Sequence, residues 1–177
     1  MADLGWPLMI NRIRDGEKSN TFGLVRTNKD GSTRPHQGWD LQTPRGMNCY
    51  AVADGEIYDT QTQPNDQGYG EYVILEFDQP VGDAKYAFYA HLSQIFVQPG
   101  KKVRLGDLIG RVGVTGNAVY VGKNDNLSST ALPQKEDHLH FELRSKPEPG
   151  LGLHGRLDPH KVYGKTPLGS AVISLRP

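Results

Sequence analysis

The sequence lacks several features by which large classes of protein are recognised. Its single cysteine, Cys49, excludes an intrachain disulfide and a cysteine-based zinc finger. Lysine and arginine together number 20, as do aspartate and glutamate, so the chain has no positive surplus with which to bind nucleic acid. No apolar run approaches the roughly 18 residues that cross a bilayer. We therefore expect neither a nucleic-acid partner nor a membrane span.

Long amphipathic helices are missing as well, and short strand-like runs separated by turns occupy most of the chain. The 21 glycines and 12 prolines supply the turns. We predict an all-β fold, an antiparallel sheet or sandwich with little helix beyond a turn near 158–162. We also predict a hairpin over 50–58 that turns at Asp54-Gly55. Further strands are predicted at 22–25, 71–77, 85–92, 95–97, 102–104, 108–114 and 138–144.

Two stretches depart from this rhythm of strands and turns. Residues 117–137 are rich in Asn, Ser, Gly and Lys, and they predict a long surface loop of the kind that is usually functional or disordered. Residues 1–30 match no pattern that we can place. We expect them to form an N-terminal extension packed on one domain that spans 31–177.

The run from His138 to Arg144 carries the clearest functional signal. Residues two apart on a strand point to the same face, so His138 and His140 project together, while Leu139 and the apolar residues that follow it face the core. Two imidazoles side by side suit a metal site, where one ligates the metal and the other moves a proton. Glu142 shares their face, where it either lines the groove or, as we expect, is a solvated strand residue.

Two further segments carry residues of the same chemistry. His36 and Asp40 stand four apart, and Pro35 and Gly38 favour an extended or loop-like segment over a helix there. Such a segment can present both side chains to one cavity. With one histidine of the His-x-His run they would give three protein ligands and an open position, as in catalytic zinc sites. His91 ends an apolar strand, from which it can reach the same cleft.

Each motif alone is weak evidence for a site. Most histidines are surface or satisfied core residues, and we interpret His154 and His160, which lie in Gly- and Pro-rich sequence, as surface residues. Cys49 begins a strand-like run, and we interpret it as a small buried apolar residue. The three histidine segments together are far more specific, because the local structure of each allows it to face one cleft.

Taken in order, HQGWDL, YAHLSQIFVQPGKKVRLGDLIGRVGVTGNA and HLHFELR resemble the lysostaphin/LytM-type zinc endopeptidases, which cut bacterial peptidoglycan. The resemblance covers roughly residues 34–145. It implies a largely antiparallel β fold of the duplicated-hybrid-motif type, with a groove lined by loops. It also implies that His36, Asp40 and His140 bind Zn²⁺ and that His91 and His138 form the catalytic pair. Which of these two histidines is the general base stays open.

The resemblance also implies a substrate and a setting. The substrate would be the stem peptides and cross-links of peptidoglycan. We expect D-Ala–diaminopimelate cross-links rather than glycine bridges, because no lysostaphin-style wall-targeting domain is attached. The enzyme would act in the periplasm or cell wall as a monomer.

The route to that compartment is a separate expectation. The first residues, MADLGWPLMINRIRDGEK, show no Sec signal. We therefore expect a signal-independent secreted effector, a phage lysis enzyme or a trimmed sequence. An effector would have an immunity or delivery protein as partner.

Two alternatives to an enzyme of this family are open. A catalytically inactive wall-binding or amidase-activator module shares the fold but lacks metal ligands, and the five filled positions argue against it. A biotinyl- or lipoyl-carrier module is suggested by the turns between Gly100 and Gly116, but the modifiable lysine hairpin that it needs is absent from the sequence.

The sequence departs from the family pattern in two places. The segment 117–137 is longer than the usual link to the His-x-His strand, which leaves one groove wall undefined. Residues 30–35 contain no tyrosine, so an oxyanion-assisting tyrosine cannot be assigned there.

Overall fold

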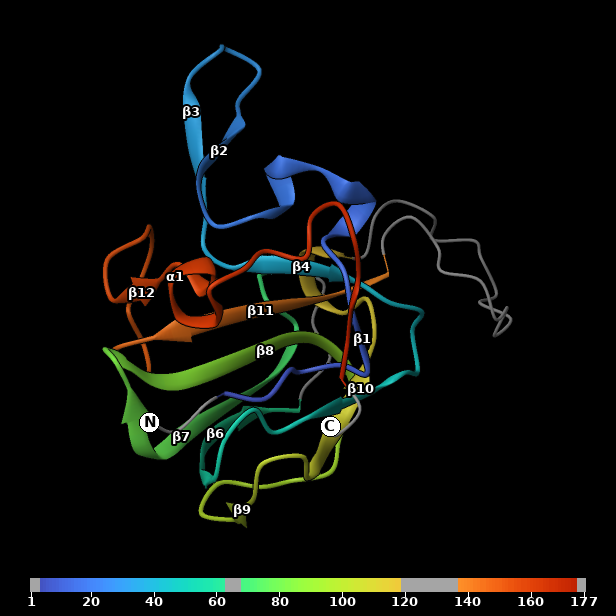
Figure 1. Ribbon diagram of the computed structural model, residues 1–177, viewed down its shortest axis with the longest axis vertical. Helices are drawn as coiled ribbons and strands as arrows, with labels where there is room; N and C mark the ends of the chain where they lie inside the picture. Colours follow the sequence, from blue (N-terminus) through green and yellow to red (C-terminus); the bar gives the residue numbers. More distant parts are fainter. Residues whose placement is uncertain (1–3, 63–67, 119–136, 175–177) are drawn as a thin grey trace.

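The computed structural model describes residues 4–62, 68–118 and 137–174, and antiparallel strands are its main regular structure (Figure 1). The strands are β1 (Ile10–Asn11), β2 (Gly23–Thr27), β3 (Thr33–His36), β4 (Trp39–Gln42), β5 (Asn48–Tyr50), β6 (Gly55–Gln61), β7 (Glu71–Val81), β8 (Ala84–Ile95), β9 (Lys102–Val103), β10 (Leu108–Val112), β11 (His138–Arg144), β12 (Arg156–Leu157) and β13 (Val172–Ile173). The helical elements are the 3-10 turns η1 (Arg14–Gly16), η2 (Lys18–Asn20) and η3 (Gly116–Ala118), and the helix α1 (Pro159–Tyr163). The all-β antiparallel fold with little helix is confirmed.

A nine-stranded sheet forms the body of the molecule. Its main path runs β12-β11-β8-β7-β6-β9, with β4 paired to β11 and β10 paired to both β5 and β8. Two small two-stranded sheets, β1-β13 and β2-β3, lie outside it. The β2-β3 hairpin projects from the body beyond β4 (Figure 1). The long strands β8 and β11, together with β3 and β4, carry the five predicted residues of the candidate site.

The two faces of the long strands differ in character. On one face, Leu139 and Phe141 of β11 are fully buried in the main core. Each large apolar side chain buried in this way contributes about 1.5–3 kcal/mol to stability. The opposite face carries a small apolar cluster around Phe88 and Ala90 of β8. The histidines and Glu142 of β11 share this second face, as the alternation along a strand requires.

The hairpin predicted over 50–58 is wrong, although strands do form on both sides of the predicted turn. β5 pairs with β10, whereas β6 pairs with β7 and β9. Gly55 already belongs to β6, and the Asp54 carboxylate accepts a hydrogen bond from the backbone N–H of Leu105 at 2.7 Å. The two strands therefore pair with distant strands instead of with each other, as they would in a local hairpin.

The predicted turn of helix near 158–162 is α1. Asp158 caps its first turn by accepting from the backbone N–H of His160 at 2.9 Å, Pro159 follows as the first helical residue, and Gly164 ends it with φ 71°. The strand predicted at 95–97 does not form by itself, because β8 runs on to residue 95 and ends there. Most of the predicted loop at 117–137 lies outside the described residues.

The N-terminal segment contributes to the core of the sheet. Leu8 and Ile13 are buried, and Trp6 stacks on Tyr163 with ring centroids 4.3 Å apart. Cys49 on β5 is fully buried in the same core. The division of the chain at residue 30 stays a prediction. Within the described ranges, no helix has the length and apolar character needed to cross a membrane.

Candidate metal centre

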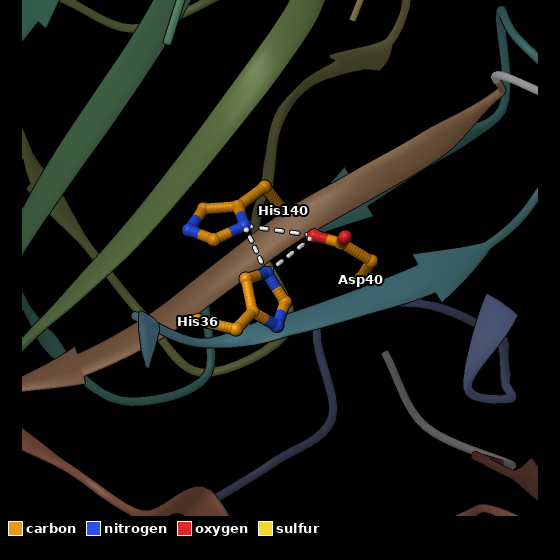
Figure 2. A group of neighbouring side chains, drawn as sticks. All are labelled: His36, Asp40 and His140. Carbon is orange, nitrogen blue, oxygen red and sulfur yellow. Dashed lines mark hydrogen bonds and ion pairs between the residues drawn. The ribbon is translucent and has the colours of Figure 1, made fainter. Parts of the chain in front are cut away.

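Strand pairing brings the three predicted ligands together. β4 and β11 are antiparallel neighbours with Asp40 directly opposite His140, and His36 ends β3 just before the bend into β4. Nε2 of His36 and Nδ1 of His140 lie 3.1 and 2.8 Å from Oδ1 of Asp40 (Figure 2). The two ring nitrogens are 3.3 Å apart. All three side chains are buried, so three donor atoms meet at one enclosed point.

Gly38 allows the bend between His36 and Asp40 to approach β11 closely. A Cβ atom at this position would lie 2.2 Å from the carbonyl oxygen of Phe141. Only glycine fits against the neighbouring backbone without a shift of the chain. The segment predicted to be extended or loop-like is formed by the end of β3, a bend at Gly38 and the start of β4, so the non-helical prediction is confirmed.

Hydrogen bonds fix which nitrogen of each ring keeps its proton when the ring is neutral. Nδ1 of His36 lies 2.8 Å from the carbonyl oxygen of Thr21, which can only accept, so Nδ1 carries the proton. Nε2 of His140 lies 2.9 Å from Oε1 of the Glu142 carboxylate and likewise donates to it. The remaining nitrogens, Nε2 of His36 and Nδ1 of His140, are the two that face Asp40. In neutral rings these nitrogens offer lone pairs, which fits a cation shared by all three residues.

Burial and neighbouring charges set the pKa values of this group. Burial lowers the pKa of His140, but hydrogen bonds to Asp40 and Glu142 outweigh burial and raise this pKa to about 9. Burial is also the main cause that lowers the pKa of His36. Burial opposes ionisation of Asp40, yet the adjacent histidines hold its pKa well below the usual range. The centre therefore binds positive charge, whether a proton or a metal ion.

Glu142 corrects one expectation from the sequence. It is fully buried, rather than a solvated strand residue. Its Oε2 accepts from Nε of Arg144 at 2.6 Å and from Nε of Arg156 at 2.7 Å. The Tyr69 hydroxyl lies 3.0 Å from Oε1. These charged and polar partners offset the cost of burying the carboxylate, so Glu142 can hold the His140 ring in place.

His91 reaches the site through an irregularity in β8. Tyr89 and Leu92 both belong to the main core, whereas Ala90 belongs to the cluster on the opposite face. Strict alternation from Tyr89 would turn His91 into the main core. The register between β7 and β8 shifts in this stretch, as it does in a β-bulge. The extra residue turns His91 toward the site and returns Leu92 to the core.

The backbone of His91 has the left-handed conformation, with φ 62°. This conformation costs a residue with a side chain about 1–2 kcal/mol. Nδ1 of the ring lies 2.8 Å from the carbonyl oxygen of Thr115, and the ring centroid is 4.9 Å from that of His138. Burial, and then the nearby histidines, lower the pKa of His91 to about 3. Strain of this kind is concentrated at functional sites.

Two arginines from the N-terminal segment also reach the centre. Nη1 of Arg14 lies 3.2 Å from Nδ1 of His138, whose Nε2 is 3.7 Å from Oδ1 of Asp40. Arg26 forms an ion pair with the other carboxylate oxygen of Asp40. The sequence contained no signal for these arginines, because their partners lie far along the chain.

A cavity of about 690 Å³ opens above the centre. Its lining includes His91, His138 and Tyr69 together with residues of β2 and β3. The structure therefore brings all five predicted residues to one cavity. His154 and His160 lie elsewhere and are exposed, in agreement with their interpretation as surface residues.

Comparison with known proteins agrees with this architecture. The family model described as Peptidase family M23 matches residues 34–150. The chain belongs to peptidase family M23. The resemblance to lysostaphin/LytM-type enzymes is confirmed by this match.

Individual known proteins resemble this chain in sequence or in fold. The peptidoglycan DD-endopeptidase ShyA of Vibrio cholerae is 32% identical over 109 residues, which is 62% of this chain and 20% of that protein. A zinc-containing peptidase from Vibrio cholerae is 26% identical with a TM-score of 0.56, over 84% of this chain and 39% of that one. The catalytic domain of lysostaphin from Staphylococcus simulans shares the fold, with 23% identity and a TM-score of 0.56 over 82% of this chain and 90% of that domain. The chain spans about a fifth of the length of the curated relatives it matches first.

Proposed function

We propose that this protein is a zinc-dependent endopeptidase that hydrolyses peptide cross-links of bacterial peptidoglycan. The observation that carries the proposal is the convergence of three buried donor atoms from His36, Asp40 and His140. Membership of family M23 supports the same chemistry. An inactive wall-binding module on this fold would have no need for these ligands or for the two further histidines beside them.

The donor set suits zinc. Two imidazole nitrogens and one carboxylate oxygen leave one position open, as in catalytic zinc sites. Zn²⁺ bound there would supply a Lewis acid for the scissile carbonyl and would lower the pKa of a water molecule toward about 7. Glu142 and the carbonyl of Thr21 hold the rings of His140 and His36 so that, in their neutral forms, both rings would offer lone pairs to such an ion.

His91 and His138 supply the proton chemistry in this proposal. One imidazole accepts a proton from the attacking water and returns it to the leaving amine. The other donates a hydrogen bond to the substrate oxygen as that oxygen gains negative charge. Both rings line the cavity and lie edge to face, so both can reach one scissile bond.

Digestion of purified peptidoglycan tests the proposal, with the products identified by mass spectrometry. We expect wild-type protein to carry about one zinc ion per chain and to release cross-link cleavage products, and a chelator to abolish both. His140→Ala should lose zinc and activity together. His138→Ala should keep its zinc and lose activity by about 10²–10⁴-fold.

The matched control is His160→Ala, since His160 is an exposed histidine outside the cavity. This variant should retain wild-type activity and zinc content. Full turnover by His138→Ala or by the chelated protein would overturn the proposed mechanism. A folded protein that binds no stoichiometric zinc would favour the inactive wall-binding module.

We further propose that the bond cut is the D-Ala–diaminopimelate cross-link and that the protein acts in the periplasm or cell wall. The relative named a DD-endopeptidase supports this bond. The same mass analysis decides between this cross-link and a glycine bridge.

As an antibacterial effector or phage lysis enzyme, the protein should be toxic when directed to the periplasm and harmless in the cytoplasm. If active enzyme is harmless when expressed in the periplasm, the effector role is wrong, and so is the expectation of an immunity or delivery partner.

A further inference from the structure

The segment that precedes the M23 match reaches into the candidate site at three points. Arg14, in η1, contacts His138; the carbonyl of Thr21 accepts from His36; and Arg26, in β2, pairs with Asp40. All three residues lie before residue 34, where the family match begins. This segment therefore belongs to the surroundings of the site, and its contact with His138 has a chemical consequence.

Arg14 determines which nitrogen of His138 carries the proton. A guanidinium group has only donors, so the nitrogen that it contacts at 3.2 Å, Nδ1 of His138, must be the acceptor. In a neutral imidazole the other nitrogen then holds the proton. That nitrogen, Nε2, is the one 3.7 Å from Oδ1 of Asp40, at the metal centre. His138 therefore presents an N–H group to the site.

His91 has the opposite arrangement. Its Nδ1 lies 2.8 Å from the carbonyl oxygen of Thr115, which accepts and cannot donate. The proton of the neutral ring is therefore on Nδ1, and Nε2 has the lone pair. The two rings, whose centroids are 4.9 Å apart, thus differ in what they offer to a substrate: one a donor and the other an acceptor.

We propose that Arg14 is a positioning residue that holds His138 as the hydrogen-bond donor and thereby leaves His91 as the general base. The proposal rests on the proposed endopeptidase function and assigns roles within that site. Arg14 itself touches neither substrate nor metal in this scheme. It acts through the ring of His138, as an outer partner does when it fixes the orientation of a functional histidine.

The proton path that follows is balanced. Nε2 of His91 takes a proton from water as the water oxygen bonds to the scissile carbonyl carbon. The N–H group of His138 donates to the carbonyl oxygen and keeps its proton. When the C–N bond breaks, the protonated His91 returns its proton to the leaving nitrogen.

Nuclear magnetic resonance of the zinc-loaded full chain, labelled with ¹⁵N histidine, tests the assignment directly. Long-range ¹H–¹⁵N correlations distinguish a protonated ring nitrogen from an unprotonated one. We expect His138 to be protonated at Nε2 and His91 at Nδ1 in the wild type. Protonation of neutral His138 at Nδ1 would overturn the proposal.

Substitution of Arg14 tests the cause. Arg14→Met should shift His138 toward a mixture of protonation forms and lower kcat about 10–100-fold, the usual effect of removing an outer partner. KM and zinc content should stay unchanged. Arg14→Lys retains a donor and should restore the Nε2–H form and most of kcat. The matched control, Arg12→Met, removes an exposed arginine two residues away and should change none of these quantities.

The two proposals fail in different ways. If wild-type protein cleaves no peptidoglycan, the proposed function is wrong, and the resonance spectrum still decides the protonation form of His138. If wild-type protein is active but Arg14→Met leaves both the spectrum and kcat unchanged, the positioning role is wrong and the endopeptidase function stands. Should Arg14→Met fail to fold, the wild-type spectrum and the Arg14→Lys variant carry the test.

Discussion

The ligand side of this centre, which contains the proposed zinc ligands, and the catalytic side, which contains the two proposed proton-transfer histidines, are held by different means. His140 rests on Glu142, a carboxylate that is fully buried between Arg144 and Arg156. His91, by contrast, is placed by a strained backbone and one carbonyl contact. His138 lies against Arg14, which belongs to the segment before the family match. Regular strands and buried charge thus fix the proposed ligands, while local backbone strain and a separate segment orient the proposed proton-transfer groups.

Substitution of Glu142 should destabilise the ligand side most. Glu142→Ala leaves two buried guanidinium groups without their carboxylate, and we expect a loss of about 3–5 kcal/mol in the free energy of unfolding. Urea denaturation of the full chain measures it. Glu148→Ala, a control at an exposed position, should stay within about 0.5 kcal/mol of wild type. A small effect of Glu142→Ala would mean that the buried network does not support the site.

Substitution of Gly38 should also destabilise the ligand side, with a smaller loss in the free energy of unfolding. The added Cβ of Gly38→Ala would meet the carbonyl oxygen of Phe141, so the bend must shift, at a cost of about 1–3 kcal/mol. Zinc affinity should fall in parallel, because His36 and Asp40 flank the bend. Gly169→Ala is the matched control, since nothing lies within 4 Å of its added Cβ. Thermal unfolding and chelator competition check both quantities, and equal effects in the two variants would contradict the prediction.

Zinc binding should depend on pH through His140. The pKa of this ring in the metal-free protein is raised to about 9, so at neutral pH zinc must displace a proton. Apparent affinity should therefore rise about tenfold, or about 1.4 kcal/mol, for each pH unit up to that pKa and level off above it. Calorimetry in two buffers of different ionisation enthalpy should detect about one proton released near pH 7.5. Binding without proton release would show that His140 is neutral in the free protein.

On the catalytic side, the strained backbone of His91 should make a glycine variant more stable than an alanine variant, the reverse of the usual order in a strand. Glycine adopts a positive φ freely and alanine does not, so His91→Gly should be more stable than His91→Ala by about 1 kcal/mol. Ordinary strand positions show the opposite order. Urea denaturation of the two variants measures the difference, and both should lose most of their activity. Greater stability of the alanine variant would mean that the left-handed conformation is not maintained in solution.

The sequence predicted the members of the site better than it predicted their supports. His138 and His140 share a face because β11 alternates regularly, and this follows from the order of residues alone. His36 and Asp40 could be placed near one cavity from the breakers Pro35 and Gly38. The signals are local in each case, and the structure brings these residues together as expected.

The supports depend on contacts between distant segments, which local patterns do not encode. Glu142 is buried because Arg144 and Arg156 neutralise it, and Arg156 lies 14 residues away on another strand. Alternation along β8 would have placed His91 in the core, and only the register shift with β7 turns it out. The hairpin predicted from Asp54-Gly55 is wrong for a related reason, because a turn motif does not specify which strands pair.

The environment of Cys49 has a practical consequence for work with this protein. Its thiol is fully buried, and burial raises its pKa to about 12, so it stays protonated and shielded from oxidants and alkylating reagents. Two copies cannot become linked through it under oxidising conditions while the fold is intact. A cysteine introduced on the β2-β3 hairpin would therefore be labelled selectively in the native protein. A fluorophore attached there would report how the wall of the cavity moves when a peptide enters.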